Sequence, residues 1–323
     1  MDNQESEKML HWKKHYVVGT GFYGSSVYFA SPMGDPSYFC SPPFAAVKSS
    51  EFQYSSPLRK EGKILQELRG CPYILHCFGE DESLENGKRT YNLLLEFAQG
   101  GTLRDLLNSK VGKKISEEEA AYYTYQILMA IFHIHSKGYI HCDINPQNIL
   151  VFPNAVIHAN GVNNRLKLAD FGSAQRKGEK TCLKSSMYLG ESLCYVSPEF
   201  IEKGNFQPVS DIWSLGCILC EMISGTMVWS EAEAKGKEDG LELHIVCKHP
   251  KIPKDVSAIA MDFIKKCLEK KHERRCTAED LIKHPFVQNF LDASTDWISK
   301  RDMFTAHSRD TLGSHFIPFK LFP

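Results

Sequence analysis

HCDINPQN, residues 141–148, is followed at once by the short apolar run of residues 149–151. Asp143 and Asn148 stand five residues apart in this stretch, and Asp170 follows later in the similar context LADFG. Any one of them alone would most simply be an Asp or Asn that caps a turn. Acid and amide side chains in this order, each next to a short apolar strand, instead indicate oxygen ligands for a hard cation such as Mg²⁺.

The size and charge of the chain indicate how many domains it has and which partners are not expected. Its 323 residues exceed the usual size of one domain, so two lobes or two domains are expected. The formal net charge of −1 gives no overall reason to expect nucleic acid or an anionic membrane as a partner. The longest apolar stretch, residues 212–223, is too short to span a bilayer and predicts a buried helix.

The cysteines and the N-terminal sequence indicate the compartment of the cell in which the protein is expected. The eleven cysteines show no framework spacing, and MDNQESEKML is too polar and acidic for a secretory signal. We therefore expect reduced thiols and a cytoplasmic location, with the nucleus as a second compartment. Cys217 and Cys220 form C-x-x-C inside the apolar stretch, where core packing is expected rather than zinc or redox chemistry. His244, Cys247 and His249 lack the further ligands of a zinc site.

The first hundred residues favour strands. β-prone runs separated by turn residues are expected at residues 16–18, 27–30, 44–47 and 92–97, with one helix at residues 57–68. The proline-rich linker at residues 31–44 predicts an exposed loop.

After Gly100 and Gly101 the pattern becomes mainly helical. Ser116 followed by Glu119 is the signature of a capping box, and it opens a long helix that Gly138 ends. Further helices are expected at residues 103–108, 211–224, 256–268 and 277–282.

The prediction is an α+β fold with two lobes. A small β-rich lobe covers residues 13–99, and a larger, mainly helical lobe covers residues 100–290. A cleft between two such lobes is a common place for a ligand. Residues 291–323, which end in the apolar FIPFKLFP, form a tail to which no role is assigned.

VGTGFYGSSV, residues 18–27, contains Gly19, Gly21 and Gly24 in the pattern G-x-G-x-x-G. Glycines let backbone amides approach phosphate oxygens because no Cβ stands in the way. A dinucleotide-binding turn would need a helix directly after the glycines, but the β-prone VYFA follows. The pattern therefore favours a glycine-rich hairpin.

AAVK ends at Lys48, and Glu61 follows in the predicted helix. A lone lysine on a strand is usually a solvated edge charge, but the apolar residues before Lys48 and the glycine-rich loop favour a position in the cleft. Glu61 would then orient it towards phosphates.

If the cleft binds ATP in this way, Asp143 would accept or orient the proton of an incoming hydroxyl. Asn148 and Asp170 would hold the metal that bridges the ATP phosphates.

In their order and spacing these motifs resemble those of eukaryotic protein kinases, over residues 13–290. SPEF at residues 197–200 is similar to the segment that closes the activation loop, and DIWSLGC at residues 211–217 to the start of the buried central helix. ERRCTAEDLIKHPF resembles the last motif of the family, in which Arg275 would pair with Glu199.

The sequence in and around these motifs is similar to that of plant MAP kinase kinase kinases of the MEKK-like type. It includes HCD in place of HRD, NLLLEFAQGGTLRDLL after the hinge and ILVFPN after the catalytic loop. Such enzymes phosphorylate Ser and Thr on MAP kinase kinases. The resemblance therefore implies ATP and Mg²⁺ as cofactors and a MAP kinase kinase as the protein substrate, and it implies no oligomeric state.

The resemblance also implies a set of residues that bind the nucleotide: Val18, Gly19, Gly21, Gly24, Val27, Ala46, Lys48, Leu95, Glu96, Ala98 and Leu150. Val18 and Leu150 would sandwich the adenine. Leu95 would be the gatekeeper, and the backbone of Glu96 and Ala98 would hydrogen-bond the adenine edge.

Asn145 is the gravest departure from the family pattern. The Ser/Thr kinases that the chain resembles carry a Lys two residues after the catalytic Asp, and tyrosine kinases usually place an Arg two or four residues after it. Here these positions hold Asn145 and Gln147, so no cation is supplied locally. Loss of one well-placed donor to developing charge costs about 2.7–4 kcal/mol, although Asn can still donate a hydrogen bond.

Two departures concern the activation segment. Cys142 replaces the Arg that would read an activation-loop phosphate, so activity is expected not to depend on phosphorylation of residues 181–192. In GESLCYVSPE, Ser192 falls where a Thr of the family would bond Asp143, and its hydroxyl would favour Ser/Thr over Tyr substrates.

The glycine-rich strand is also irregular. Val27 comes one residue late after Gly24. This predicts either a bulge in the strand or Ser26 in the place of the valine over the adenine.

Three hypotheses follow from the sequence. The first is an ATP-dependent Ser/Thr protein kinase, slowed at phosphoryl transfer. The second is a pseudokinase scaffold that binds ATP or partners without efficient transfer, which Asn145 and the altered loops favour. The third is an unrelated binding protein in which the motifs coincide by chance.

Overall fold

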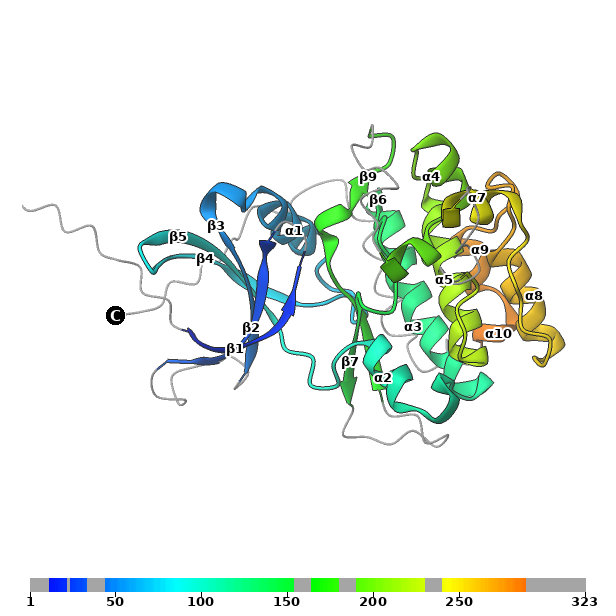
Figure 1. The fold of residues 1–323 in the computed structure, drawn as a ribbon, viewed down its shortest axis with the longest axis horizontal. Helices are drawn as coiled ribbons and strands as arrows, with labels where there is room; N and C mark the ends of the chain where they lie inside the picture. The colour runs from blue at the N-terminus through cyan, green and yellow to red at the C-terminus, as the bar shows by residue number, and fades with distance from the viewer. Residues whose placement is uncertain are drawn as a thin grey trace, which may run out of the picture.

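The computed structural model of the chain describes residues 12–21, 24–33, 44–153, 164–179, 190–229 and 240–288. Figure 1 shows two lobes, a small one built on a β-sheet and a larger one built mainly of helices. The predicted two-lobed α+β fold is confirmed. Three segments lie outside the described residues: the tail at residues 291–323, most of the linker at residues 31–44, and residues 181–189 of the segment 181–192.

The small lobe contains one antiparallel sheet in the order β1-β2-β3-β5-β4. Its strands are β1 Trp12–Thr20, β2 Ser26–Pro32, β3 Ala45–Glu51, β4 Cys77–Glu85 and β5 Lys88–Glu96. The turn between β4 and β5 consists of Asn86 and Gly87, with φ of 50° and 78°. Asn-Gly is favoured in such two-residue hairpins because both positions require positive φ.

The sequence analysis did not predict β4, because its residues, CFGEDESLE, are rich in acids that are rare in strands. In the structure two of these acids pair with cations from neighbouring elements. Glu82 lies 2.9 Å from Arg59 and 2.7 Å from Arg89, and Glu85 lies 2.6 Å from Lys14. The strand therefore forms through contacts that a local pattern does not contain.

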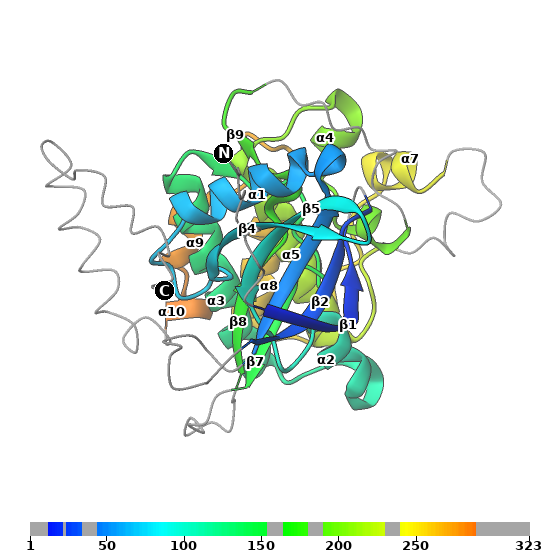
Figure 2. The same cartoon turned by 90° about the vertical axis from the view of Figure 1, so that its left-hand side faces the viewer.

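One helix, α1 Ser56–Glu67, packs on the sheet (Figure 2), as the periodicity of residues 57–68 predicted. Gly62 lies on its buried side. A Cβ at this position would stand 2.9 Å from Leu93 Cδ1 of β5. Glycine therefore lets the helix lie close to the sheet at the residue directly after Glu61.

The large lobe is formed by α2 Leu103–Ser109, α3 Glu117–Ser136, α4 Pro198–Lys203, α5 Pro208–Ser224, α7 Gly240–Cys247, α8 Ala258–Cys267, α9 Ala278–Ile282 and α10 Pro285–Gln288. The predicted start of α3 is confirmed, because Ser116 Oγ accepts a hydrogen bond from the Glu119 backbone. The helix ends before Gly138, whose φ is 78°. Cys217 and Cys220 are buried in α5, as expected for core residues.

Two short ladders in the large lobe face the small one. β6 Tyr139–Ile140 pairs with β9 Gln175–Arg176, and β7 Ile149–Pro153 pairs with β8 Asn164–Leu168. The loop of residues 141–148 leaves β6 and enters β7, and residues 169–174 join β8 to β9. The pairing of these strands therefore brings the two polar motifs together at the cleft.

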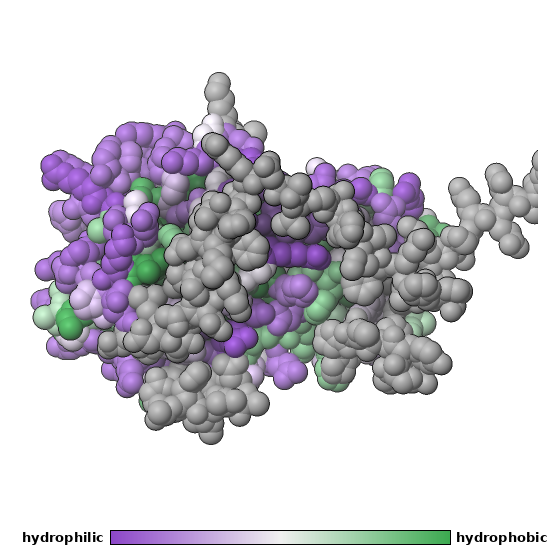
Figure 3. Space-filling view, turned by 180° about the vertical axis from the view of Figure 1, so that it is seen from behind, coloured by the Kyte–Doolittle hydropathy of each residue, from purple (hydrophilic) through white to green (hydrophobic). Residues whose placement is uncertain are grey.

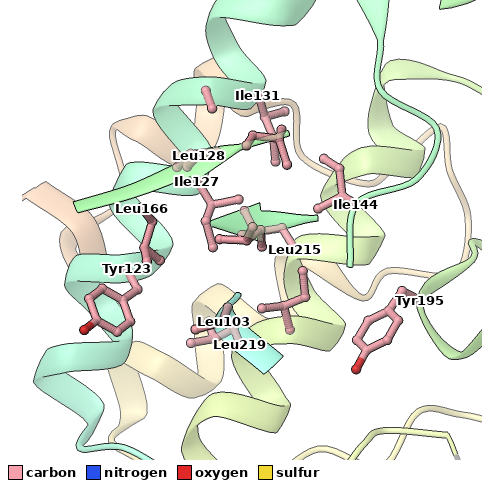
Figure 4. Packing of buried hydrophobic residues seen from close by; sticks show 14 of the residues in the cluster. Leu103, Tyr123, Ile127, Leu128, Ile131, Ile144, Leu166, Tyr195, Leu215 and Leu219 are labelled. Carbon is pink, nitrogen blue, oxygen red and sulfur yellow. The ribbon is translucent and has the colours of Figure 1, made fainter. Parts of the chain in front are cut away.

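The core of the large lobe fixes the loop of residues 141–148 from below. Figure 4 shows side chains of α3, such as Ile127 and Ile131, facing Leu215 and Leu219 of α5. Ile144, which stands between Asp143 and Asn145 in the sequence, reaches into this same core and is 2% exposed. Its burial anchors the loop, so the side chains on either side of it have little freedom.

On the face seen in Figure 3, hydrophilic side chains dominate the described surface of the large lobe, with hydrophobic ones in small separate spots. Among the described residues there is no helix with the length and apolar character needed to cross a membrane.

The predicted pair between Arg275 and Glu199 is present and buried. Arg275 Nη1 lies 2.7 Å from Glu199 Oε1, and Nη2 lies 2.9 Å from Oε2. Ser210 of α5 donates a further hydrogen bond to the same carboxylate at 2.8 Å. The pair joins the segment after α8 to α4. Because both charges are buried, loss of either partner would leave the other charge without compensation.

Replacing Arg275 by Leu is expected to destabilise the fold by about 3–5 kcal/mol, because the Glu199 carboxylate would remain buried without its cation. The neighbouring Arg274 is exposed, so Arg274→Leu is the matched control and should change stability by less than about 0.5 kcal/mol. Urea unfolding followed by tryptophan fluorescence measures both. Equal effects of the two substitutions would contradict a structural role of the buried pair.

Candidate active site

Lys48 of β3 joins the two lobes at the cleft. Its Nζ lies 2.7 Å from Glu61 Oε2 of α1 and 3.0 Å from Asp170 Oδ1, in the segment after β8. Burial alone would lower the pKa of Lys48, but the carboxylates of Glu61 and Asp170 reverse this and raise the pKa. The ammonium therefore stays charged in the cleft, as a phosphate-binding lysine must.

A cavity of about 560 Å³ lies between the lobes, and most of the predicted nucleotide-binding residues line it. They are Val18, Gly19, Gly21, Val27, Ala46, Lys48, Leu95, Glu96, Ala98 and Leu150, together with Glu61, Asn148 and Asp170. Gly24 is not in the lining; it is exposed, with φ of 74°. The sequence analysis missed several lining residues, among them Leu75, Phe97, Thr102, Asp105 and Gln147.

A bulge lies in β1, before the glycine-rich loop, whereas β2 pairs residue by residue from Ser26 onward. Val17 pairs with Tyr28 and Gly19 pairs with Val27, so Val18 has no partner across the ladder. Val27 is part of the cavity wall, and Ser26 is not. A Cβ on Gly21 would stand 2.4 Å from Ser25 Oγ and 3.1 Å from Lys48 Cε, so a larger residue here would displace these side chains.

The strand that leads into the hinge carries the gatekeeper position. Leu95 is 4% exposed and lies opposite Ala46 across the β3–β5 ladder, so the two side chains close the back of the cavity. The Glu96 N–H donates to His76 O at 2.9 Å. A contact from Glu96 to an adenine edge would therefore use its carbonyl oxygen.

The Asp143 carboxylate is held at both oxygens by amides of its own loop. Asn145 Nδ2 donates to Oδ1 at 2.9 Å, and Asn148 Nδ2 donates to Oδ2 at 2.8 Å. Burial raises the pKa of Asp143 to about 7, and the nearby charge of Asp170 contributes to the rise. The hydrogen bonds from Asn148 and Asn145 act in the opposite direction. Asp143 is thus an acid whose proton can be exchanged near neutral pH.

Two residues that the sequence analysis did not assign to the site fix the backbone of this loop. Asp211, at the start of α5, accepts from the backbone N–H of His141 at 3.0 Å and from that of Cys142 at 3.1 Å. His141 Nε2 lies 3.0 Å from Ala169 O, and its Nδ1 accepts from the Asp143 N–H at 3.3 Å. Burial lowers the pKa of His141, so the neutral ring can donate at Nε2 and accept at Nδ1.

The signal for Asp211 was present in DIWSLGC, where a carboxylate precedes a mainly apolar helix. Such an acid is buried only if its oxygens find donors, and these donors come from a loop about 70 residues earlier in the chain.

The sequence model described as the protein kinase domain matches residues 12–287. The chain belongs to the protein kinase family. It is similar to mitogen-activated protein kinase kinase kinase 20 of Arabidopsis thaliana, with 34% identity over 280 residues, covering 86% of this chain and 78% of that protein. Mitogen-activated protein kinase kinase kinase 17 of the same plant is 33% identical over 283 residues, covering 86% of this chain and 70% of that protein. MAP kinase kinase kinase wis4 of Schizosaccharomyces pombe is 31% identical over 304 residues, covering 87% of this chain and 20% of that protein.

Members of the protein kinase family act on proteins and use ATP with a divalent metal ion. The donor atoms present in this kinase suit such an ion. Asp170 Oδ1 accepts hydrogen bonds from Lys48 at 3.0 Å and from the Gly172 N–H at 3.3 Å, which leaves Oδ2 for a cation. Asn148 donates through Nδ2, which leaves its amide oxygen. A carboxylate and an amide oxygen at one edge of the cleft fit a hard divalent cation.

Asn145 does not point a donor towards the phosphate side of this kinase's cleft. It is 4% exposed, its Nδ2 contacts Asp143, and its Oδ1 accepts from the Gln147 N–H at 2.9 Å. Gln147 lines the cavity, whereas Asn145 does not. The side chain that replaces the usual lysine therefore acts on the loop and on the Asp143 carboxylate.

Cys142 belongs to the loop of residues 141–148, and Ser192 belongs to the end of the activation segment. Cys142 is buried with φ of 69°, and burial raises the pKa of its thiol well above the usual range, so no charge faces the segment from this position. Ser192 lies half-buried in the short 3₁₀ helix η7, Gly190–Tyr195. Its bond to Asp143 stays a prediction.

The pKa of Asp143 predicts a pH dependence. Because the carboxylate form must accept the hydroxyl proton, the rate of phosphoryl transfer should rise from about pH 6 to about pH 8, as Asp143 loses its proton. Asn145→Leu removes one of the hydrogen bonds that lower this pKa, so it should move the midpoint to higher pH. Initial rates across this range measure the shift.

The matched control is Asn108→Leu, on the exposed side of α2, which should leave the midpoint unchanged. A midpoint that stays the same in Asn145→Leu would show that Asn145 does not influence the ionisation of Asp143.

Proposed function

We propose that this chain is an ATP-dependent Ser/Thr protein kinase that acts as a MAP kinase kinase kinase and phosphorylates MAP kinase kinases. The observation that carries the proposal is the assembled cleft, in which Lys48 contacts Glu61 and Asp170 while Asp143 is held nearby. The similarity to the plant and yeast proteins supports the choice of substrate class.

The residues divide the work of transfer between them. Lys48 would hold the phosphates of ATP, and Glu61 would keep its ammonium in place. Asn148 and Asp170 would hold Mg²⁺, which when bound would neutralise charge on the phosphates. Asp143 would orient the substrate hydroxyl and take its proton as the oxygen bonds to the γ-phosphorus and the bond from that phosphorus to ADP breaks.

A slower transfer step follows from the position of Asn145. No cation from the catalytic loop stabilises the transferred phosphoryl group, and one such donor is worth about 2.7–4 kcal/mol. The two amides that hold Asp143 would keep the base oriented towards the substrate hydroxyl.

A pseudokinase scaffold is the second candidate. The observation that favours it is the engagement of Asn145 with Asp143 and Gln147, which directs it away from a bound phosphate. Such a protein would bind ATP or partner proteins in the same cascade without efficient transfer.

For location, we propose the cytoplasm, with the nucleus as a second compartment. The support is the set of eleven cysteines without framework spacing, which suits a reducing environment. Imaging of a fluorescent fusion in plant cells tests this, and secretion of the fusion would contradict it.

Transfer of radiolabelled phosphate from Mg·ATP to a generic MAP kinase kinase separates the two candidates. Wild type should transfer phosphate, and Asp143→Asn should lower the rate by roughly 10²–10⁴. Asn145→Lys should raise it by about 10–10² because it restores a cation near the γ-phosphate. If wild type and Asp143→Asn are both at background, the scaffold is the correct function.

Activity should not require phosphorylation of the activation segment, because Cys142 supplies no charge to bind a phosphate there. Glu substitutions at Thr181, Ser185 and Ser186, one at a time, should change the transfer rate by less than about twofold. Gln at the same positions is the uncharged control. A strong activation by Glu and not by Gln would contradict this prediction.

A further inference from the structure

A second cavity, of about 640 Å³, lies behind the hinge, and we call it the rear cavity. It is bounded by the end of α1, the segment of residues 69–78 that leads into β4, and Lys167 of β8; Figure 2 shows these elements. Its wall is mainly apolar, with Leu68, Ile74 and Phe78 among its residues. Its volume is within the range of about 300–1,000 Å³ that is usual for small-molecule sites.

The rear cavity is separated from the nucleotide cleft by a thin wall. Leu75 and Glu96 line both cavities. Glu96 Oε2 accepts from the His76 N–H at 3.3 Å, and the Glu96 N–H donates to His76 O at 2.9 Å. Because these bonds hold the first residue of the hinge against the rear wall, the two spaces are distinct sites.

The charged side chains around the rear cavity leave a net positive charge. Lys167 Nζ lies 2.5 Å from Glu96 Oε2, so these two charges neutralise each other. Arg69 is exposed, donates to Cys77 O at 3.2 Å, and has no carboxylate within ion-pair distance among the residues that the structure describes. One positive charge at the edge of the cavity therefore remains without a counter-ion from those residues.

The positive charge of Arg69 also affects the pKa of His76. Burial lowers the pKa of its ring, and the Arg69 guanidinium lowers it further, so the ring is mostly neutral at pH 7. The ring packs edge-on against Phe78, with 4.8 Å between the ring centroids. The edge of the cavity thus combines an aromatic pair with a single cation.

We propose that the rear cavity is a binding site for a small apolar monoanion, distinct from the nucleotide cleft. Its aromatic or aliphatic body would lie against the apolar wall, where Pro72 and Phe78 are partly exposed. Its carboxylate or sulfonate would pair with Arg69. An apolar body without the charge would gain no ion pair with Arg69, and a dianion would exceed the one available cation.

The test uses anilinonaphthalene sulfonate, a fluorescent apolar monoanion, titrated into the full chain. Wild type should show saturable binding, and Arg69→Glu should weaken it at least about tenfold, as expected for loss of a charge-assisted hydrogen bond and gain of a repulsive charge. Lys63→Glu is the matched control because Lys63 is exposed on α1, outside the cavity, and it should change the affinity less than about twofold.

Two further measurements keep the result specific. His76→Trp places a larger ring at the edge of the cavity and should also weaken binding, with an unfolding midpoint equal to that of wild type. Phenylnaphthylamine, which has similar rings without the sulfonate, should bind wild type and Arg69→Glu equally. The proposal is overturned if wild type shows no saturable binding, or if Arg69→Glu and Lys63→Glu have the same effect.

Discussion

The ion pairs of Lys48 are the contacts on which the geometry of the cleft depends. They connect β3, α1 and the segment after β8, which are elements of both lobes. With a side chain of Lys48 only 8% exposed, the ammonium has lost most of its water, and its carboxylate partners must replace it. A change that moves α1 away from the sheet would therefore leave a buried charge unpaired, which ties the position of the helix to that of Asp170.

Much of this arrangement could be predicted from the sequence, because periodicity and cap residues are local signals. The bounds of α1 and the cap of α3 at Ser116 follow from such patterns. β4 could not be predicted in this way, because Glu82 and Glu85 are stabilised partly by Arg59 and Lys14, which lie in other elements. The part that Asp211 plays was missed for the same reason, since its hydrogen-bond donors belong to the loop of residues 141–148.

In the candidate site, too, some features could be predicted from the sequence and others could not. Residue types and spacing identified Lys48, Asp143 and Asp170, because each is required by the chemistry of phosphate and metal. The direction of a short side chain is set by its hydrogen bonds, and a sequence does not contain these. Asn145 was judged by the cation that it replaces, whereas the structure shows it holding the carboxylate of Asp143.

The edges of the five-stranded sheet have a consequence for how this protein associates with others. β1 and β4 are the two edge strands; β1 has register shifts after Lys14 and Val17, and β4 has one after Cys77. Both strands also carry charged side chains. A broken hydrogen-bonding row with charges along it is a poor template for a strand of another chain. The sheet is thus protected against growth by strand addition, and contacts with other proteins would have to use side chains.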